Sequence, residues 1–501
     1  MTCQQIYNFF LFRKAFLLVS YPKVPYWMSA KELHAEIIKN SAFALTHSQE
    51  QWAEAISTFV SQKKKDNLFI LQGYAGTGKS SMVALLVAAL PRIGQRAVLL
   101  APTGRAAKVL SSYARKKAFT IHKKIYFSNA ESGKLRFRLK NNSHRNTLFI
   151  VDESSMIGED TSVGRLFERG SLLHDLVNYV EEGDNCKLIF VGDTAQLPPV
   201  SLVLSPALDP DKLNYEFNKA VAVTVLEEVV RQQLDSGILF NATQLREQIA
   251  AEDPSQFTFS LEGYTDVIRL QDGNEFLESL SQALHEDKED AAVLIVRSNK
   301  RANQYNRSIR ERILFLESDL AVGDSLMVVK NNYHWLSEED PAGFIANGDT
   351  LRVQKIHGYK ELYGFKFAEV TVQMIDYPDQ PPFQTTLLLD TLHSNTASLS
   401  QDQSQQLYEK VNEDYAHLSS KFKRLQKVRS NPYFNALQVK YSYAITCHKS
   451  QGGQWREVFV EMPYLPDGPT VDFYRWLYTA ITRAQEKLYL IGFSKNYFLG
   501  N

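Results

Sequence analysis

The stretch Gly73-Tyr-Ala-Gly-Thr-Gly-Lys-Ser80 decides the fold of this chain. It follows an apolar run at residues 68–72 and precedes a helix-prone stretch at residues 82–90. A strand, a glycine-rich loop and a helix in this order are typical of the phosphate-binding loop of α/β proteins. Glycines let backbone N–H groups turn toward phosphates, and the N-terminus of the next helix favours negative charge. The stretch therefore predicts a nucleotide site in which Lys79 reaches the terminal phosphates and the Ser80 hydroxyl binds Mg²⁺.

Two other apolar runs end in polar residues that suit the same chemistry. Residues 148–151 are followed by Asp152 and Glu153, and residues 188–191 lead through a Gly-Asp pair to Gln196. Ligands bind open α/β sheets at the carboxyl ends of the strands. Asp152 is expected to hold the metal through water, and Glu153 to orient and deprotonate the attacking water. An Asp-Glu pair alone is as often a solvated helix start, but three such strand ends together predict a nucleoside triphosphatase.

The composition is that of a folded protein with several domains. At roughly 150 residues per domain, a chain of 501 residues has room for about three compact units. Hydrophobic residues make up 44% and charged residues 22%, which fits neither a disordered chain nor a repeat fibre. Lys plus Arg and Asp plus Glu both number 56, so any attraction to nucleic acid must come from where the charges lie. Three widely spaced cysteines argue against a disulfide framework and favour a reducing, cytoplasmic location.

Residues 1–40 are interpreted as an N-terminal extension. The apolar runs at residues 9–12 and 15–19 are separated by Arg13 and Lys14, and neither approaches the roughly 20 residues that span a bilayer. The order of charged and apolar residues also differs from that of a secretory signal. We therefore expect no membrane segment, and we hypothesise that translation begins at Met28.

The rest of the chain alternates apolar runs with helical patterns, as expected of parallel sheets covered by helices. The segments predicted to be strands of these sheets are residues 68–72, 97–101, 148–151, 187–191, 292–296 and 487–491. Between about residues 322 and 390, shorter alternating segments separated by turns predict a small β unit. Residues 398–429 are polar and helical and end in a basic run.

Six motifs in a fixed order give the chain a family resemblance. They are Gly73 to Ser80, Ala101-Pro-Thr-Gly-Arg-Ala-Ala-Lys108, Asp152-Glu-Ser-Ser-Met, Gly192-Asp-Thr-Ala-Gln-Leu-Pro-Pro, Tyr443-Ala-Ile-Thr-Cys-His-Lys-Ser-Gln-Gly452 and Tyr478-Thr-Ala-Ile-Thr-Arg-Ala484. The series resembles the superfamily 1 helicases over roughly residues 40–500. More narrowly, Asp-Glu-Ser-Ser-Met and His-Lys-Ser-Gln-Gly resemble the RecD-like and Dda-like branch, which moves 5′ to 3′ along single-stranded DNA. The polarity rests on this resemblance.

The resemblance implies a domain plan. Two RecA-like α/β domains would hold ATP between them, the first at residues 41–220 and the second at 221–320 and 436–501. A basic β-hairpin at about 122–146 would be inserted in the first domain. A small SH3-like β-barrel with helices, at residues 321–435, would be inserted in the second.

The resemblance also assigns roles around ATP and Mg²⁺. Gln49 is similar to the glutamine that recognises the adenine edge, although an ordinary exposed glutamine at a helix start would look the same. Arg231 and Arg483 are similar to the two arginines that the second domain supplies to the phosphoryl transition state, and either could instead be a surface arginine. The expected catalytic residues are Lys79, Asp152, Glu153, Gln196, Arg231 and Arg483. The expected nucleotide ligands are Gln49, Gly73, Ala75, Gly76, Thr77, Gly78, Lys79, Ser80, Ser81, Gln451 and Gly452, and the expected metal ligands are Ser80 and Asp152.

Nucleic-acid binding has separate support from the charge pattern. Seven cations, Lys123, Lys124, Lys134, Arg136, Arg138, Lys140 and Arg145, face one acid, Glu131. Strict alternation over residues 134–140 places four of these cations on one strand face and predicts a hairpin at residues 125–139. In the family such a hairpin splits the duplex, whereas the alternative is an edge strand protected by charge.

The residues that we expect to bind the strand come from both domains. They are Pro102, Thr103, Thr120, His122, Arg136 and Arg138 in the first domain, and Thr446 and His448 in the second. The two histidines could instead be structural. Cys447 is expected to be a small packed side chain rather than a nucleophile.

The predicted function is that of an ATP-dependent DNA helicase acting in repair, recombination or replication. The expected partners are single-stranded DNA and junctions of single-stranded with double-stranded DNA, with the protein acting as a monomer. Two alternatives stay open. One is an RNA helicase of the same superfamily, and the other is a nucleic-acid-binding subunit of a nuclease or repair complex that uses ATP as a switch.

Overall fold

A computed structural model of the protein describes residues 29–62, 67–129, 136–159, 171–229, 235–285, 291–337, 340 and 342–499. For residues 128, 129, 136 and 137 it describes the backbone alone. The hypothesis of a start at Met28 concerns residues outside this set.

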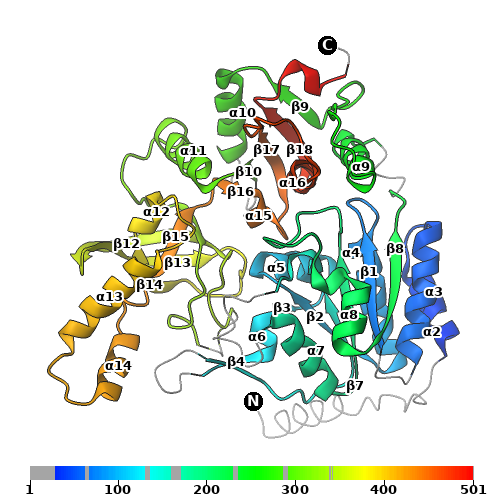
Figure 1. Ribbon diagram of the computed structural model, residues 1–501, viewed down its shortest axis with the longest axis horizontal. Coiled ribbons are helices and arrows are strands. Elements are labelled where there is room, and N and C mark those ends of the chain that lie inside the picture. Colours follow the sequence, from blue (N-terminus) through cyan, green and yellow to red (C-terminus); the bar gives the residue numbers. More distant parts are fainter. Residues whose placement is uncertain are drawn as a thin grey trace, which may run out of the picture.

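The first domain is built on a parallel sheet of six strands (Figure 1). Its strands are β1 (Asn67–Gly73), β2 (Arg96–Ala101), β3 (Ala118–Thr120), β6 (Arg145–Val151), β7 (Asp184–Gly192) and β8 (Ala220–Leu226), in the order β3-β2-β6-β7-β1-β8. Because every pair is parallel, the carboxyl ends of β1, β6 and β7 lie along one edge. This is the arrangement that the three polar strand ends predict.

Helices cover both faces of this sheet, because successive strand side chains point to opposite faces. Phe69 and Leu71 of β1 pack into one core, whereas Leu68 and Ile70 pack into the other. The first core lies under α2 (Ala30–Asn40), α3 (His47–Ser61), α4 (Lys79–Ala89) and α5 (Gly104–Ala114), and the second under α6 (Ile121–Ile125), α7 (Leu172–Glu182) and α8 (Pro210–Phe217). Buried Leu33 and Ile37 make α2 a part of this domain, although the sequence analysis assigned it to the extension.

The second domain repeats the plan with five parallel strands. These are β9 (Val267–Leu270), β10 (Ala292–Val296), β16 (Ala444–Thr446), β17 (Trp455–Glu461) and β18 (Ala484–Ile491), in the order β16-β10-β17-β18-β9. One face is covered by α9 (Gly237–Ala250), α15 (Cys447–Ser450) and α16 (Val471–Ile481), and the other by α10 (Gly273–His285) and α11 (Asn299–Arg312).

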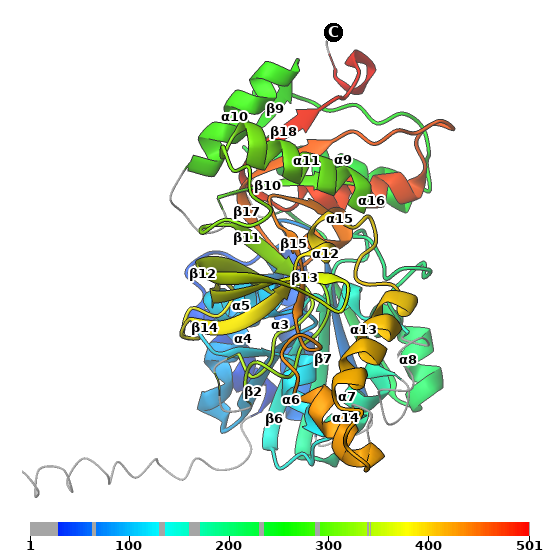
Figure 2. The same ribbon diagram turned by 90° about the vertical axis from the view of Figure 1, so that its left-hand side faces the viewer.

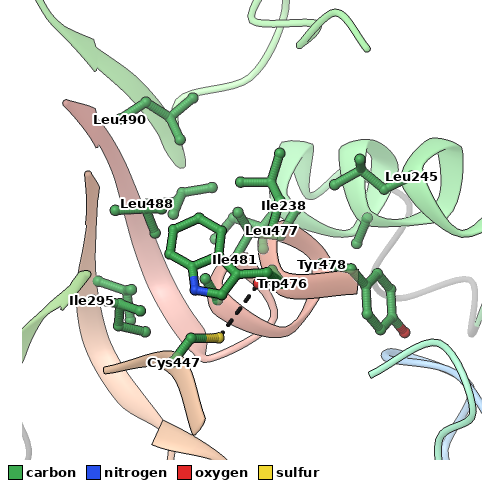
Figure 3. Close-up of a cluster of buried hydrophobic side chains, with 14 of the residues drawn as sticks. Ile238, Leu245, Ile295, Cys447, Trp476, Leu477, Tyr478, Ile481, Leu488 and Leu490 are labelled. Atoms are coloured by element: carbon green, nitrogen blue, oxygen red, sulfur yellow. Dashed lines mark hydrogen bonds between the residues drawn. The ribbon is translucent and has the colours of Figure 1, made fainter. Parts of the chain in front are cut away.

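Figure 3 shows the first of these cores, where α9 and α16 pack against β18. Cys447 lies fully buried at its edge, and its thiol donates to the carbonyl oxygen of Trp476 at 3.4 Å. Burial raises the pKa of this thiol to about 12, so the prediction of a packed rather than a nucleophilic cysteine is confirmed.

A closed barrel interrupts the second domain between α11 and β16. It consists of β11 (Ser325–Val328), β12 (Thr350–Leu362), β13 (Phe365–Met374), β14 (Phe383–Leu388) and β15 (Leu437–Tyr441). The segment between β14 and β15 contains α12 (Asp390–His393), α13 (Gln401–Asp414) and α14 (Lys421–Arg429). Figure 2 looks onto the barrel, with the second sheet above and the first below.

Two domain boundaries differ from those predicted. The barrel extends beyond residue 435, because β15 pairs with both β11 and β14 and thereby closes it. The first domain likewise extends beyond residue 220, because β8 pairs with β1 along its whole length. In both cases a strand that looks separate in the sequence joins a sheet: β15 closes the barrel, and β8 forms one edge of the first sheet.

The predicted basic hairpin is present. Strands β4 (Tyr126–Asn129) and β5 (Arg136–Leu139) are antiparallel, with Tyr126 opposite Leu139. The arrangement of two RecA-like domains with a hairpin in the first and a barrel in the second is therefore confirmed. Among the described residues, no helix combines the length and apolar character needed to cross a bilayer.

Candidate active site

The glycine-rich loop connects β1 to α4 and has the geometry of a phosphate cradle. Gly76 and Gly78 have φ values of 76° and 86°, which side chains rarely tolerate. A Cβ on Gly73 would lie 2.9 Å from Thr77 Oγ1 and 3.1 Å from Leu226 Cβ. The loop therefore requires glycine for its backbone turns and for its close packing.

Lys79 is the first residue of α4 and folds back over the loop. Its ammonium donates to the carbonyl oxygens of Gly73 at 2.6 Å and Tyr74 at 2.9 Å. Thr77 is buried, with its hydroxyl on the same Tyr74 carbonyl at 2.9 Å, while Ser80 and Ser81 are exposed in the first turn of α4. A cation, two hydroxyls and the amides of a helix N-terminus converge here, a donor set that fits a polyphosphate with Mg²⁺.

Asp152 directly follows β6 and is one of the two expected metal ligands. Its carboxylate accepts hydrogen bonds from the Tyr113 hydroxyl of α5 and, at 2.9 Å, from the backbone N–H of Glu153. Burial raises the pKa of Tyr113 well above its usual range, and the nearby Ser80 side chain acts in the opposite direction. Burial raises the pKa of Asp152, and hydrogen bonding with Tyr113 acts in the opposite direction. The two expected metal ligands thus lie near the same phenol.

Glu153 and Arg483 meet across the cleft between the domains. Glu153 has a φ of 51°, and its Oε1 lies 3.9 Å from Nη1 of Arg483. Burial raises the pKa of Glu153, while the Arg483 guanidinium lowers it. Arg483 is only 4% exposed, and Nε donates to the Thr479 carbonyl oxygen at 3.0 Å. The structure therefore brings together the expected base and one of the expected arginines.

Gln196 lies on the loop that follows β7, and Gln451, at the end of α15, contacts this loop. Gln196 is buried, and its Oε1 has no hydrogen-bond partner among the described residues. An orphaned amide oxygen that can accept a hydrogen bond suits the orientation of an attacking water. Gln451 reaches the same loop from the second domain, because its Nε2 donates to the Leu197 carbonyl oxygen at 2.7 Å.

Three expected nucleotide contacts lie differently from what their roles suggest. Gln49 is fully buried; its Nε2 donates to the Thr77 carbonyl oxygen at 3.0 Å, and its Oε1 accepts from the Thr46 N–H at 3.1 Å. Gly452 lies against α5, where an added Cβ would be 2.7 Å from Ala106 Cβ. The Ala75 N–H donates to the Tyr478 hydroxyl of the second domain at 2.8 Å. Their roles toward ATP stay predictions, as does that of Arg231, which lies outside the described residues.

The sequence analysis missed three residues that shape this site: Tyr113, Tyr478 and Glu228. Glu228 accepts from the N–H and hydroxyl of Ser48, at 2.9 and 2.7 Å, and thereby ties the start of α3 to the segment after β8. Tyr478 was quoted as part of a motif but given no role. Each acts through a partner far away in the chain, so the sequence offers no local signal for its role.

The expected nucleic-acid contacts of the first domain fall into two groups. Pro102 and Thr103 are half-buried at the start of α5, where the Thr103 side chain accepts from the Ala106 N–H at 3.2 Å. Thr120 is 3% exposed and caps α6 through the Lys123 N–H at 3.2 Å. Burial lowers the pKa of His122 to about 4, which keeps this ring neutral. Thr120 and His122 thus have evident structural roles, and their contact with nucleic acid stays a prediction.

The other residues expected to contact nucleic acid lie on the hairpin and in the second domain. Arg138 is exposed on β5, whereas the side chain of Arg136 lies outside the described set. Thr446 is half-buried and His448 is exposed at the start of α15. Lys449 beside it has a buried ammonium without a hydrogen-bond partner among the described residues, which suits an anionic ligand.

Two protein-family models match parts of this chain. Residues 45–271 match the family model "AAA domain", and residues 441–491 match the "UvrD-like helicase C-terminal domain". The ATP-dependent DNA helicase Dda of Enterobacteria phage T4 is 24% identical over 86% of this chain and 95% of its own length. The ATP-dependent RecD2 DNA helicase of Deinococcus radiodurans is 29% identical over 35% of this chain and 23% of its own length.

A solved structure of the Pif1 helicase from Bacteroides, in complex with ADP-AlF3 and single-stranded DNA, is also similar. It is 16% identical, has a TM-score of 0.44, and the match covers 92% of this chain and 95% of that one.

Proposed function

Because the chain belongs to the superfamily 1 helicases, in the branch of Dda and RecD2, we propose that it is an ATP-dependent DNA helicase. It hydrolyses ATP between its two RecA-like domains, translocates 5′ to 3′ along single-stranded DNA and separates the duplex ahead of it. The observation that carries this proposal is the approach of Arg483, from the second domain, to Glu153 of the first at 3.9 Å.

Each part of the cleft has a task in hydrolysis. Lys79 and the loop amides bind the phosphates, Glu153 takes the proton of the attacking water, and Gln196 orients that water. Arg483 neutralises the charge that develops at the transferred phosphoryl group, and arginines in this position contribute about 10³ to 10⁵ in rate. Arg231 is proposed as the second arginine. ATP supplies the phosphoanhydride bond whose cleavage drives the cycle.

Mg²⁺ is the proposed cofactor. Ser80 and Asp152 would hold it, because both are oxygen donors of the kind that Mg²⁺ prefers and both lie near the Tyr113 hydroxyl, which donates to Asp152. Burial raises the pKa of Asp152. A divalent cation would stabilise its charged form.

The proposed partner is single-stranded DNA at a junction with duplex. The strand would lie over Pro102 and Thr103 in the first domain and over Thr446 and His448 in the second. Arg138 and its neighbours on the hairpin would meet the duplex. Phosphate contacts of this kind weaken as salt rises, and bases add about 1–3 kcal/mol each by stacking on aromatic rings.

We further propose that the protein acts as a monomer in the cytoplasm, in repair, recombination or replication. Support for a monomer comes from the site itself, because Glu153 and Arg483 belong to one chain and need no second copy. The described cysteines, Cys186 and Cys447, are buried free thiols, which suits a reducing compartment.

The first test combines ATP hydrolysis with strand separation. We expect single-stranded DNA to stimulate hydrolysis, and duplexes with a 5′ tail to be unwound while those with a 3′ tail are not. Stimulation by RNA in place of DNA, or unwinding from a 3′ tail, would contradict the proposal.

Lys79→Ala tests the assignment of the site. Loss of the Lys79 ammonium, which lies over the loop backbone, should reduce hydrolysis at least about 10²-fold, because the phosphates lose a positive charge beside them. The unfolding midpoint should stay that of the wild type. Lys116→Ala, at an exposed lysine of the same domain, is the matched control and should hydrolyse ATP normally. Normal turnover by Lys79→Ala would mean that the nucleotide binds elsewhere.

A further inference from the structure

One tyrosine hydroxyl joins the two loops of the first domain to a helix of the second. Tyr478 lies on α16 and is 1% exposed. Its hydroxyl accepts the N–H of Ala75 at 2.8 Å and donates to Oδ2 of Asp193 at 2.7 Å. In Figure 3 the ring turns away from the hydrophobic cluster and its oxygen points toward the ribbon of the first domain. The Tyr478 hydroxyl thus donates one hydrogen bond to the first domain and accepts another from it.

The same face of α16 holds the rest of the loop after β7. Arg475 Nη1 donates to the Thr194 carbonyl oxygen at 2.6 Å, and the Thr479 hydroxyl accepts the Leu197 N–H at 2.8 Å. Ala195 and Leu197 are buried in the hydrophobic core of the second domain. This loop, which carries Gln196, therefore packs into the core of the second domain, although it follows a strand of the first domain.

Tyr478 and Arg483 are rigidly connected. Arg483 lies two residues after the end of α16, and its Nε donates to the carbonyl oxygen of Thr479, the residue after Tyr478. A shift of the α16 backbone at Tyr478 therefore moves the guanidinium that faces Glu153. In contrast, Ala75 belongs to the loop whose amides are proposed to bind phosphate. We expect the position of its N–H group to change when the bound nucleotide changes.

We propose that Tyr478 is a positioning residue that sets the place of Arg483 according to the state of the phosphate-binding loop. This rests on the proposed function, because it assumes that ATP is hydrolysed in this cleft. Asp193 fixes the direction of the phenol proton, so the phenol oxygen stays an acceptor for Ala75. Burial and the neighbouring Asp193 charge raise the pKa of Tyr478 well above its usual range, so the hydroxyl keeps its proton throughout the working pH range.

The helix itself offers a matched control. Tyr474 lies one turn earlier on α16 and is also fully buried. Its hydroxyl likewise accepts one backbone N–H, from Phe257 at 3.1 Å, and donates to one oxygen, the Ser255 carbonyl. Both of its partners belong to the second domain. Tyr474→Phe and Tyr478→Phe thus remove the same atom and the same number of hydrogen bonds. The bonds of Tyr478 reach the first domain and include a charged acceptor, whereas those of Tyr474 stay within the second domain.

The test measures kcat, KM and the binding of ADP with and without aluminium fluoride, using the full chain and single-stranded DNA. Tyr478→Phe should lower kcat about 10- to 100-fold, the effect expected for a lost hydrogen bond to a charged group, with KM changed less than about threefold. It should weaken binding of ADP with aluminium fluoride and leave ADP binding unchanged, because Arg483 acts in the transition state. Tyr474→Phe should leave all four quantities near wild type.

A double-mutant cycle identifies the route of the effect. In an Arg483→Ala background, Tyr478→Phe should lower kcat little further, because the residue that it positions is already gone. An equal loss in both backgrounds, or an equal loss in Tyr474→Phe, would overturn the proposal. If Tyr478→Phe does not fold, Asp193→Asn provides the same test by removing the charged acceptor. Failure of the wild type to hydrolyse ATP would instead overturn the proposed function.

Discussion

Glu228 fixes the start of α3, the helix that carries Gln49. It accepts two hydrogen bonds from Ser48, and these lower its pKa to about 2. A carboxylate whose pKa is lower in the folded than in the unfolded state stabilises the fold above its unfolded pKa, which is about 4.3 for glutamate. That contribution is lost as the pH falls from there toward 2. Stability should therefore depend on Glu228 at neutral pH and cease to do so in acid.

Glu228→Gln tests this dependence. Urea unfolding of the variant should show lower stability than the wild type above about pH 5, and the difference should shrink steadily as the pH is lowered to 3. Glu227→Gln, at the exposed preceding residue, should show no such pH-dependent difference. A difference that is the same at pH 7 and pH 3 would mean that the Glu228 charge does not support α3.

Residues such as Lys79, Glu153 and Arg483 could be predicted because their chemistry is encoded within a few neighbouring positions. Glu228, Tyr113 and Tyr478 could not, because their partners lie far away in the chain and become neighbours through the packing of sheets and helices. Gln49 lies between these cases. Its motif marks it, but its amide is bonded within the protein, which the motif does not encode.

At the scale of elements, α3 is held at its other end by a lysine from the sheet. Lys187 of β7 is 6% exposed, and its ammonium donates to the carbonyl oxygens of Phe59 and Gln62, where α3 ends. It also lies 4.8 Å from the centre of the Phe59 ring. A cation at this position satisfies carbonyl groups that the helix leaves without partners.

Lys187→Met should expose the role of this cap. The side chain keeps its length and loses its donor, so the buried Phe59 and part-buried Gln62 carbonyl oxygens lose their partner at a cost of about 1–3 kcal/mol. Hydrogen exchange should increase at the end of α3 first, with α7 changed little. Lys116→Met, at an exposed position, is the control. Unchanged exchange in α3 would show that water replaces the ammonium without loss.

The central strands β1, β2, β6, β7 and β10 could be predicted from their apolar runs, because helices cover both of their faces. Strand β8 was missed because it lies at the edge of its sheet, and six of its seven residues are partly or fully exposed. Strand β17 was missed because Arg456 and Glu457 interrupt its apolar pattern. Apolar runs therefore predict a strand that is buried on both faces. They fail for an exposed edge strand such as β8 and for a strand such as β17 that contains charged residues.

At the scale of the whole molecule, three parts of the protein meet at Arg105. This residue lies in α5 of the first domain and is 7% exposed. Its guanidinium lies 4.5 Å from the ring centre of Trp455 in the second domain, and its Nε is 3.4 Å from Asp376 Oδ1 in the barrel. Beside it, a Cβ on Gly104 would come within 2.1 Å of Asp349 Oδ1, so the barrel fits closely against the start of α5. Thr103, an expected DNA contact, is two residues away.

This junction should carry movement of the barrel to both domains, and Arg105→Met tests that role. Methionine keeps the contact with Trp455 and removes the charge that holds Asp376, so the barrel loses its ionic attachment to α5. Unwinding should fall at least about tenfold, the size of a typical coupling between sites, while hydrolysis without DNA stays within about threefold of wild type. Arg352→Met, at an exposed arginine of the barrel, should unwind normally. If Arg105→Met unwinds as well as the wild type, the barrel does not need this ionic contact for coupling.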